Sequence, residues 1–362
     1  MYSFQKINPI KEDWSKIESS FESTVFHSQQ WNNYLRRIGL VTITIKVLLN
    51  NQVVGYFMGE KVGWRSFSLI AAPFNGIGTY TQGLVMLQET TENERISIYR
   101  ELADWLFVNR ITSLLQVDDW YLRRTSAEWI PYEAFHHELL EAEGLSYSVR
   151  PTLCVPVNTD EETMWSGLHY KSAKYCINKA NKLGLYVREI TNKCEIVTFT
   201  RYHYSQLVEV CAKQGMRPKP SQSQKRMQAL CEELFPNRVI MLECRGKDDN
   251  GVEQVMSTGI FCIDKGESIY WTGASFQRYQ KFCPNELMVW EAMKLCNQRG
   301  AGILNFGGMA TYKLKFGTVY EYVPRINFIK HKWVYVVKRM AQNTYFIIRK
   351  TIAKIIGKRS FK

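Results

Sequence analysis

The order of hydrophobic segments occurs twice in this chain, and this repetition limits the folds that it can adopt. The first half has a hairpin pattern, a strand, a helix at 92–108 and a further strand. The second half repeats that order around a helix at 284–299. Alternating apolar residues indicate strands, and a period of 3.6 indicates helices. We therefore predict an α/β (α+β) protein of two duplicated units, each a mixed, mainly antiparallel sheet flanked by helices. Two unrelated α/β units could share this order, because it is common.

The length also favours two domains, because 362 residues exceed what one core usually holds. We place an N-terminal domain at 1–150, a C-terminal domain at 151–329 and a tail at 330–362. Residues 322–362 contain 11 Lys or Arg and no Asp or Glu, which leaves 36 basic and 34 acidic residues in 1–321. A nucleic-acid-binding body would carry a basic face of its own. The charge therefore predicts an anionic surface met by the tail.

The tail has the pattern of a basic amphipathic helix over 332–356. Its apolar residues would share one side: Trp333, Val337, Met340, Ile348 and Ile355. Its basic residues would lie opposite or on the flanks: Lys338, Arg339, Arg349 and Lys350. Such a helix is typical of attachment to an anionic membrane surface. A terminal helix packed on the body and an arm contacting tRNA are the alternatives.

The cysteines and the N-terminus favour a cytoplasmic protein. None of the 9 cysteines forms a CxxC or zinc-knuckle spacing, so we expect reduced thiols and no metal. The first residues lack a basic segment followed by an apolar one, and no run of about 18 apolar residues follows. With the tail, these features predict a cytoplasmic protein that is peripheral on the inner face of the membrane.

The segment 268–317 offers an anion site. It reads as a strand, a loop, a helix from Pro284 that stops at Gly300, a second strand and a glycine turn. The unpaired N–H groups at a helix N-terminus suit phosphate. Arg278 and Lys281 precede this terminus, where the helix dipole disfavours cations unless an anion lies between them. An ordinary crossover helix is the alternative.

Two lysine groups could contact an anionic substrate. Lys313 and Lys315 follow Gly307-Gly308 and would point the same way on an extended segment. They would look the same on a solvated edge strand. A second group would share one arc of a continuous helix at 162–183: Lys171, Lys174, Lys179 and Lys182. A solvated helix face is the alternative explanation for these four.

The usual catalytic sets are missing. The sequence has no GxSxG, HExxH or Walker lysine loop, and its 6 histidines are scattered. This disfavours a metal hydrolase and favours chemistry that positions two substrates, as in acyl transfer to an amine. Such a reaction needs a polarised carbonyl, an amine that loses its proton and an acid for the leaving group. A strand amide and a tyrosine can supply much of this.

Three segments resemble one family. They are MWSGLHYKSAKYCINKANKLGLYV at 164–187, YWTGASFQRYQKFCPNELMVWEAM at 270–293 and GAGILNFGGMATYKLKFG at 300–317. The last contains a Lys-x-x-Phe-Gly pattern. Together they resemble the GNAT-fold proteins of the FemAB and BioF2-like acetyltransferase group, which includes Fem-type aminoacyltransferases and acetyltransferases of polysaccharide biosynthesis. FHSQQW and APFNGIGTY in the first half match more weakly.

The resemblance implies a GNAT-family N- or O-acyltransferase of two GNAT-like units. The acceptor would be an amine or hydroxyl of an anionic sugar-nucleotide or lipid-linked precursor of the cell envelope. The donor would be acetyl-CoA or another acyl-CoA in one branch and aminoacyl-tRNA in the other, and we expect acetyl-CoA. The alternatives are a Fem-type peptidyltransferase of peptidoglycan that uses aminoacyl-tRNA, and a non-catalytic scaffold of a polysaccharide-synthesis assembly.

The resemblance also suggests site residues. The donor would contact Gly273, Ala274, Ser275, Arg278, Lys281, Asn285 and Glu286. The acceptor would contact Lys171, Lys174, Trp271, Asn305, Gly307, Gly308 and Lys315. Tyr312, as acid to the leaving group, and Lys313 would be catalytic. The chain departs from the family at Lys174, which replaces a frequent Arg and loses bidentate recognition, and at Asn305, which replaces an expected Asp.

Overall fold

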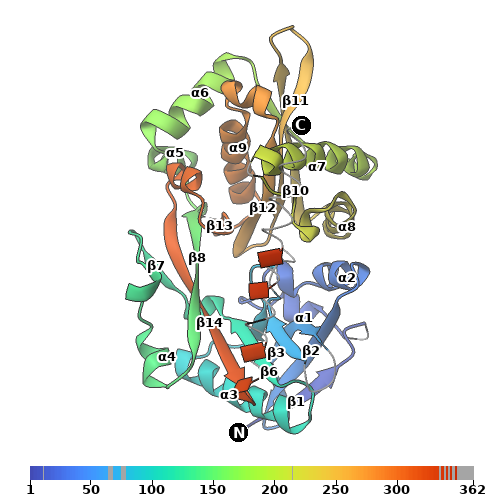
Figure 1. The fold of residues 1–362 in the computed structure, drawn as a ribbon, viewed down its shortest axis with the longest axis vertical. Helices are drawn as coiled ribbons and strands as arrows, with labels where there is room; N and C mark the ends of the chain where they lie inside the picture. The colour runs from blue at the N-terminus through green and yellow to red at the C-terminus, as the bar shows by residue number, and fades with distance from the viewer. Residues whose placement is uncertain are drawn as a thin grey trace. The chain divides into compact units, whose positions relative to one another are not determined.

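The computed structural model separates into two compact units (Figure 1). Unit 1 comprises Met1–Pro151 and Tyr320–Arg349, and unit 2 contains Thr152–Val319. The structure describes the chain except for residues 11, 64–67, 75–78, 214, 334–335, 338–339, 341–342, 345–346 and 349–362.

The sheet of unit 1 follows the order β1–β2–β3–β4–β6–β14, with β5 beside β3 and β7 beside β14. The β4–β6 pair is parallel, whereas β1–β2, β2–β3, β3–β4 and β6–β14 are antiparallel. The bounds are β1 (Tyr2–Ile7), β2 (Val41–Leu49), β3 (Gln52–Val62), β4 (Leu69–Ala72), β5 (Gly83–Met86), β6 (Leu114–Asp118), β7 (Arg124–Ser126) and β14 (Val319–Ile329).

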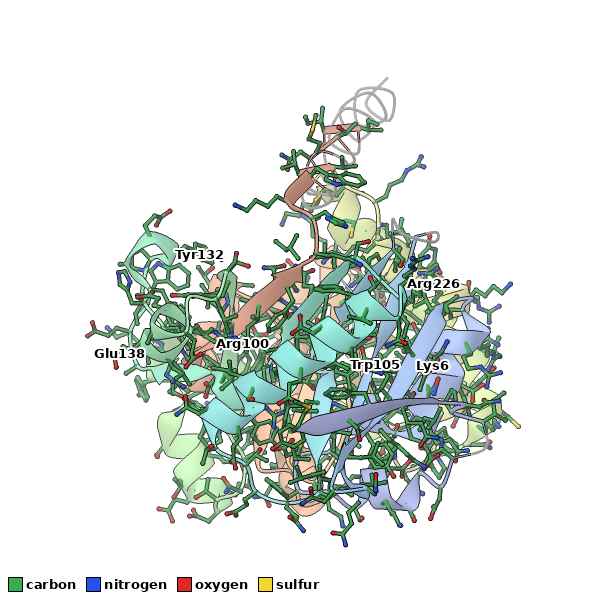
Figure 2. The ribbon with its side chains drawn as sticks, turned by 90° about the horizontal axis from the view of Figure 1, so that it is seen from below. Lys6, Arg100, Trp105, Tyr132, Glu138 and Arg226 are labelled. Atoms are coloured by element: carbon green, nitrogen blue, oxygen red, sulfur yellow. The ribbon has the colours of Figure 1, made fainter. Side chains whose placement is uncertain are left out.

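Helix α3 (Glu92–Val108) covers the sheet of unit 1. It starts where predicted, because Thr91 and Glu94 cap each other's backbone N–H groups. Its buried face joins the main apolar cluster with β2, β4 and β6. Trp105 (labelled in Figure 2) belongs to this helix. Its ring centroid lies 6.0 Å from that of Phe4 on β1. The other helices are α1 (Ser15–Glu18), α2 (Gln29–Arg37) and α4 (Glu138–Ala142).

The sheet of unit 2 follows the order β13–β12–β11–β10–β9, and residues 154–156 of β8 (Tyr147–Pro156) pair with β13. Only β12–β13 is parallel among these pairs. The bounds are β9 (Tyr186–Glu189), β10 (Val239–Lys247), β11 (Glu253–Cys262), β12 (Glu267–Ser275) and β13 (Ile303–Asn305). Each unit thus repeats a hairpin, a strand, a helix and a parallel strand, which confirms the predicted fold class.

Helices cover both faces of the unit 2 sheet. On β11, Ser257 contacts Met288 of α9 (Pro284–Gln298), whereas Thr258 contacts Gln206 of α7 (Ile196–Lys213). Because neighbouring residues of a strand point to opposite faces, α9 and α7 lie on opposite sides. The remaining helices are α5 (Glu161–Gly167), α6 (Tyr175–Lys182) and α8 (Gln224–Leu234).

The last strand differs from the predicted domain division. Residues 320–329 of β14 were expected in the C-terminal domain, yet they pair with β6 and β7 of unit 1. Ile326 and Phe328 join the apolar cluster of unit 1. An apolar pattern identifies a strand but not the sheet edge that it joins, so the sequence could not place it.

The predicted continuous helix at 162–183 is wrong. Helix α5 ends at Gly167, Leu168 is extended, and a π-helical turn at Tyr170–Lys174 precedes α6. His169 donates its backbone N–H to the Lys315 carbonyl at 2.9 Å, which holds the break in place. The four lysines therefore do not share one helix face.

The predicted tail helix lies only partly within the described residues. Those described between 332 and 348 are helical, whereas Lys338, Arg339, Arg349, Lys350 and Ile355 fall outside them. None of the described helices is both long and apolar enough to cross a membrane.

Candidate functional site

Strands β12 and β13 diverge at the centre of unit 2. Their parallel pairing ends at Ile269 opposite Asn305. Beyond that point β12 continues along β11 to Ser275, whereas Phe306 donates its N–H to Leu153 of β8 at 2.8 Å. A register shift on β12 makes Trp271 a bulge, and its side chain is buried. Diverging strands with a bulge expose backbone groups that a ligand can use.

Asn305 organises the turn that follows β13. Its Oδ1 accepts from Thr152 Oγ1 at 2.6 Å and from the Gly307 N–H at 2.8 Å, while its Nδ2 donates to Glu267 Oε1 at 2.7 Å. Asn305 and Glu267 are 2% and 3% exposed. An Asp at 305 would face the Glu267 carboxylate directly. The neighbouring Glu267 carboxylate therefore explains why position 305 carries an amide.

The two glycines after β13 have backbone angles that other residues rarely adopt, with φ of +65° at Gly307 and +90° at Gly308. Their N–H groups donate to Asn305 Oδ1 and Thr152 Oγ1. Both amides are thus satisfied within the protein, while the carbonyls of the same turn face a buried cation.

That cation is Lys313, which is 8% exposed. Its ammonium donates to the carbonyls of Phe306, Gly307 and Gly308 at 2.6, 3.1 and 3.3 Å. Burial lowers the pKa of Lys313 to about 8, and the charge of Lys219 contributes to this shift. Lys313 thus changes its charge near physiological pH, which a solvated lysine does not.

Lys313 and Lys315 do not point the same way, so that prediction is wrong. Residues Thr311–Phe316 form the 3₁₀ helix η9, not an extended segment. At three residues per turn, positions two apart lie on different sides. The Lys315 ammonium instead pairs with Glu286 Oε1 at 2.5 Å. Gly317 ends η9 with φ of +74°, and a Cβ there would lie 2.8 Å from the Gly167 carbonyl oxygen.

Tyr312 is the residue next to this lysine. The residue as a whole is 48% exposed, and its hydroxyl hydrogen-bonds with Tyr270. Desolvation of that hydroxyl raises the pKa of Tyr312, so the hydroxyl is protonated at neutral pH and is able to act as an acid. A Cβ at Gly273 would lie 1.8 Å from the Tyr270 hydroxyl, so only glycine leaves room for this pair.

The cations expected to hold donor phosphates have partners within the protein. Arg278 lies over the rings of Phe276 and Tyr279, at 4.8 Å from each centroid. Lys281 pairs with Asp249. Both belong to the 3₁₀ helix η8 (Gln277–Phe282) that joins β12 to α9. These contacts give the two cations a structural explanation without a ligand.

The other donor residues lie where the sequence placed them, at the junction of β12 and α9. Ala274 and Ser275 are buried at the end of β12, and Ser275 Oγ accepts from Asn285 Nδ2 at 2.9 Å. No side chain caps the start of α9 within the described part of the chain. The first-turn amides at Asn285 and Glu286 thus keep the anion-binding character of a helix N-terminus.

The acceptor lysines of the π-helical turn are separated from one another. Lys174 donates to the Ser166 carbonyl at 3.2 Å and lies 6.0 Å from the Trp165 ring centroid. Lys171 is exposed. Lys171 is therefore accessible to an anionic ligand, whereas Lys174 has a structural contact with α5.

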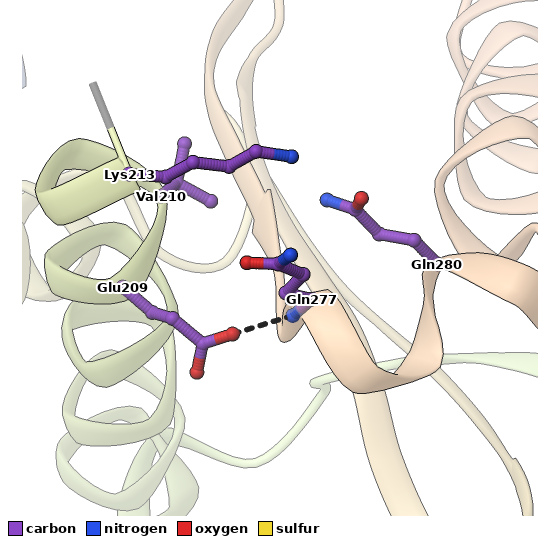
Figure 3. A pocket seen from close by; sticks show the side chains of 5 residues that line it. All are labelled: Glu209, Val210, Lys213, Gln277 and Gln280. Atoms are coloured by element: carbon purple, nitrogen blue, oxygen red, sulfur yellow. Dashed lines mark hydrogen bonds between the residues drawn. The ribbon is translucent and has the colours of Figure 1, made fainter.

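A pocket lies between α7 and η8, and no pattern in the sequence indicates it. Its lining side chains come from both elements: Glu209, Val210, Lys213, Gln277 and Gln280 (Figure 3). The cavity volume is about 290 Å³. Glu209 accepts the Gln277 N–H at 2.6 Å, which joins the two walls (Figure 3). Such a volume is at the small end for a ligand site.

His203 of α7 has a structural role. It is fully buried and bridges Thr258 Oγ1 at 2.7 Å and Thr272 Oγ1 at 3.3 Å. Burial lowers its pKa to about 3, so it stays neutral at physiological pH. It joins α7 to the sheet.

We expect Asn305→Asp to make stability depend on pH. The new carboxylate would face Glu267, so one of the two must take up a proton, and its folded-state pKa would exceed the unfolded value. Stability would be retained at low pH and lost as pH rises through that pKa, by about 1–3 kcal/mol. Urea unfolding at pH 5 and pH 8 measures this. Combining Glu267→Gln with Asn305→Asp should restore stability, and an equal loss at both pH values would contradict the pairing.

Comparison with known proteins agrees with this architecture. Residues 200–313, which include β10 to β13, match the FemAB family. No curated protein sequence matches the chain. The fold is similar to that of FemX, at 12% identity and a TM-score of 0.67, over 92% of this chain and 99% of FemX.

Two further structures share the fold. One is the C-terminal domain of a putative lysylphosphatidylglycerol synthetase from Agrobacterium fabrum, at 10% identity and a TM-score of 0.54, over 91% of this chain and 95% of that one. The other is a conserved protein of unknown function from Bacteroides thetaiotaomicron, at 10% identity and a TM-score of 0.51, over 90% and 100%. With the family match over residues 200–313, they confirm the expected resemblance to the FemAB group and show that the chain shares the fold of FemX.

Proposed function

We propose that this protein transfers an acyl group from an activated ester or thioester to an amine or hydroxyl of a cell-envelope precursor. The observation that carries the proposal is the buried Lys313 ammonium beside the diverging strands β12 and β13, at 5.9 Å from the ring centroid of Tyr312. Negative charge develops on the acyl carbonyl oxygen in such a reaction, and a desolvated cation stabilises it far more than a solvated one. Tyr312 supplies the proton to the leaving group and is restored by the proton that the attacking amine or hydroxyl loses.

For the donor, the contacts favour an aminoacyl ester of tRNA over acetyl-CoA. The cations assigned to the phosphates of CoA are held by Phe276, Tyr279 and Asp249. The likeness to FemX and to the FemAB family points to the Fem-type branch. Acetyl-CoA is the second candidate, supported by the uncapped first turn of α9.

One assay separates the donors. The full chain is incubated with a lipid-linked or nucleotide-linked peptidoglycan precursor and either labelled acetyl-CoA or labelled aminoacyl-tRNA. Transfer from aminoacyl-tRNA that ribonuclease abolishes supports the Fem-type donor, and transfer from acetyl-CoA alone reverses the choice. Transfer from neither donor contradicts the proposal. Transfer that depends on Lys313 would exclude the alternative of a non-catalytic scaffold. The main support for that alternative is the amide at Asn305, and its hydrogen bond to Glu267 explains that amide.

The acceptor is proposed to be anionic. Lys171 is an exposed cation of unit 2 on the turn before α6, and Lys179 and Lys182 follow on α6. Phosphates or carboxylates of a sugar-nucleotide or lipid-linked precursor complement these charges.

Lys171→Glu should raise KM for the acceptor while leaving kcat unchanged, because this contact is made equally in the ground and transition states.

We also propose that the tail attaches the protein to an anionic membrane from the cytoplasmic side. Its described large apolar side chains are exposed: Trp333, Val336, Val337, Met340, Ile347 and Ile348. The sequence from 322 to 362 adds 11 basic residues and no acidic ones, which complements anionic lipid. Each basic residue near such a surface contributes about 1 kcal/mol.

Removing the tail after Lys330 should abolish binding to anionic vesicles. Lys330 is kept because its N–H donates to the Ser113 carbonyl and its ammonium to the Phe107 carbonyl. Sedimentation with phosphatidylglycerol vesicles at low and high salt measures binding, and far-UV circular dichroism checks the fold. Full-length protein should be released by salt. Equal binding of the truncated chain would refute the membrane role.

A further inference from the structure

Two cysteines and a glutamate meet where α6 approaches the start of α9. The Sγ atoms of Cys176 and Cys283 and a carboxylate oxygen of Glu286 all lie within 4.8 Å of one another. Cys176 is in the first turn of α6, whereas Cys283 and Glu286 are the residue before α9 and the third residue within it. All three belong to unit 2.

We propose that Cys176, Cys283 and Glu286 form a binding site for a divalent zinc ion. Two thiolates and one carboxylate are ligands that zinc accepts in a tetrahedron, and three protein ligands leave the fourth position for water or a substrate group. Two sulfurs bound at about 2.3 Å in a tetrahedron lie roughly 3.8 Å apart. The two thiols are already in hydrogen-bond contact, which suits that separation.

The backbone conformation at Cys283 supports a ligand-binding site at this position. Cys283 has φ of +60° and ψ of +40°, in the left-handed region that glycine normally occupies. A cysteine held there costs of order 1–3 kcal/mol, and such residues cluster at ligand-binding positions. Glycine or asparagine would meet the needs of the turn at lower cost. A thiol at this position is therefore explained better by a ligand than by the turn.

The surrounding charges fit a bound ion. Two thiolates, one carboxylate and Zn²⁺ sum to one negative charge. Lys315 already pairs with Glu286, and the positive charge of Lys179 acts on Cys283. These lysines balance the excess negative charge of the occupied site.

Binding must displace the thiol protons. Zn²⁺ takes the place of one proton on each sulfur, so two Zn–S bonds form, two S–H bonds break and no electron is transferred. Affinity should therefore increase with pH over the range where thiols lose protons.

Titration of the full, metal-stripped chain with Co²⁺ and Zn²⁺ tests the site. We expect about one ion per chain, a Co²⁺–thiolate charge-transfer band that Zn²⁺ removes, and release of about two protons per ion. Cys176→Ser should weaken binding at least about tenfold, since one thiolate ligand is lost. Glu286→Gln should weaken it with the charge-transfer band retained. Cys194→Ser is the matched control, because Cys194 is exposed and outside the cluster.

Three results would overturn the proposal. One is the absence of a cobalt–thiolate band in the wild-type chain. Another is equal binding by wild type and Cys176→Ser. The third is a Cys176–Cys283 disulfide, seen as a mass loss under mild peroxide, in a chain that binds no Zn²⁺ when reduced. These readouts do not use acyl transfer, so they stand whether or not the proposed activity does.

Discussion

Replacing Lys313 by Met should lower kcat for acyl transfer by about 10²–10³, the usual cost of removing one group that stabilises an oxyanion. The buried ammonium is the only cation that the structure places on the carbonyls of Phe306, Gly307 and Gly308 among the described residues. Steady-state kinetics with the donor that the assay above selects measures the loss. Lys294→Met is the control, because Lys294 lies outside the proposed site and pairs with Glu291 on α9.

The pH profile distinguishes a chemical role of Lys313 from a structural one. With a pKa of about 8, the ammonium loses its proton above that pH, so kcat/KM should fall there. Lys313→Arg keeps the charge at all accessible pH values and should remove this fall while retaining part of the activity. A wild-type profile without an inflection near pH 8, or the same inflection in Lys313→Arg, would show that another group titrates.

The elements that the sequence predicts well carry their own local signals. Helix α3 begins after the Thr91 and Glu94 capping pair, and α9 begins at Pro284 and ends just before Gly300. Caps and breakers act on the backbone within one turn, so no tertiary information is needed to find them. The same signals led to the segment between β12 and η9, where the candidate site lies.

The details that sequence reasoning missed depend on contacts between distant segments. Strand β14 joins β6 because of its pairing, which its own pattern does not encode. The alternation of Lys313 and Lys315 is typical of a strand, yet η9 forms because one lysine enters the carbonyl turn and the other reaches Glu286. Periodicity alone does not show which of these partners a lysine will find.

The sequence also does not show which partners a single side chain meets. The sequence alone presents Asn305 as the loss of a functional carboxylate, whereas in the structure its amide donates to Glu267 Oε1 at 2.7 Å. Cys176 and Cys283 are far apart in the sequence, so no spacing rule could pair them. Arg95 lies on the same face of α3 as Tyr99, where the pattern predicts apolar residues, and its burial depends on two acidic partners from other segments.

Replacing Arg95 by Met should destabilise unit 1 by about 3–5 kcal/mol, the cost of leaving buried charges without a partner. Arg95 is 3% exposed and binds Asp119 Oδ2 at 2.6 Å, Glu22 Oε1 at 2.8 Å and the Leu84 carbonyl at 2.8 Å. Tyr99 donates to the same Asp119 oxygen at 2.6 Å. Without the guanidinium, two carboxylates would remain in a site that water does not reach.

The loss should depend on pH. Burial already raises the pKa of Glu22, and the charge of Arg95 opposes that rise. In Arg95→Met the opposing charge is gone, so the folded-state pKa of Glu22 would lie further above its unfolded value. Stability would then be present at low pH and lost as pH rises through the raised pKa of Glu22. Urea unfolding between pH 5 and pH 8, with hydrogen exchange of the α3 amides as a local readout, measures the effect.

Two further variants isolate the charge. Arg100→Met removes an exposed arginine from the same helix, paired with Glu143 at 2.7 Å, and should cost less than about 1 kcal/mol (Figure 2). Adding Glu22→Gln to Arg95→Met removes one of the two stranded carboxylates and should recover part of the loss and flatten its pH dependence. If Arg95→Met were no more damaging than Arg100→Met, the network would be dispensable, and unit 1 would owe its stability to the apolar cluster alone.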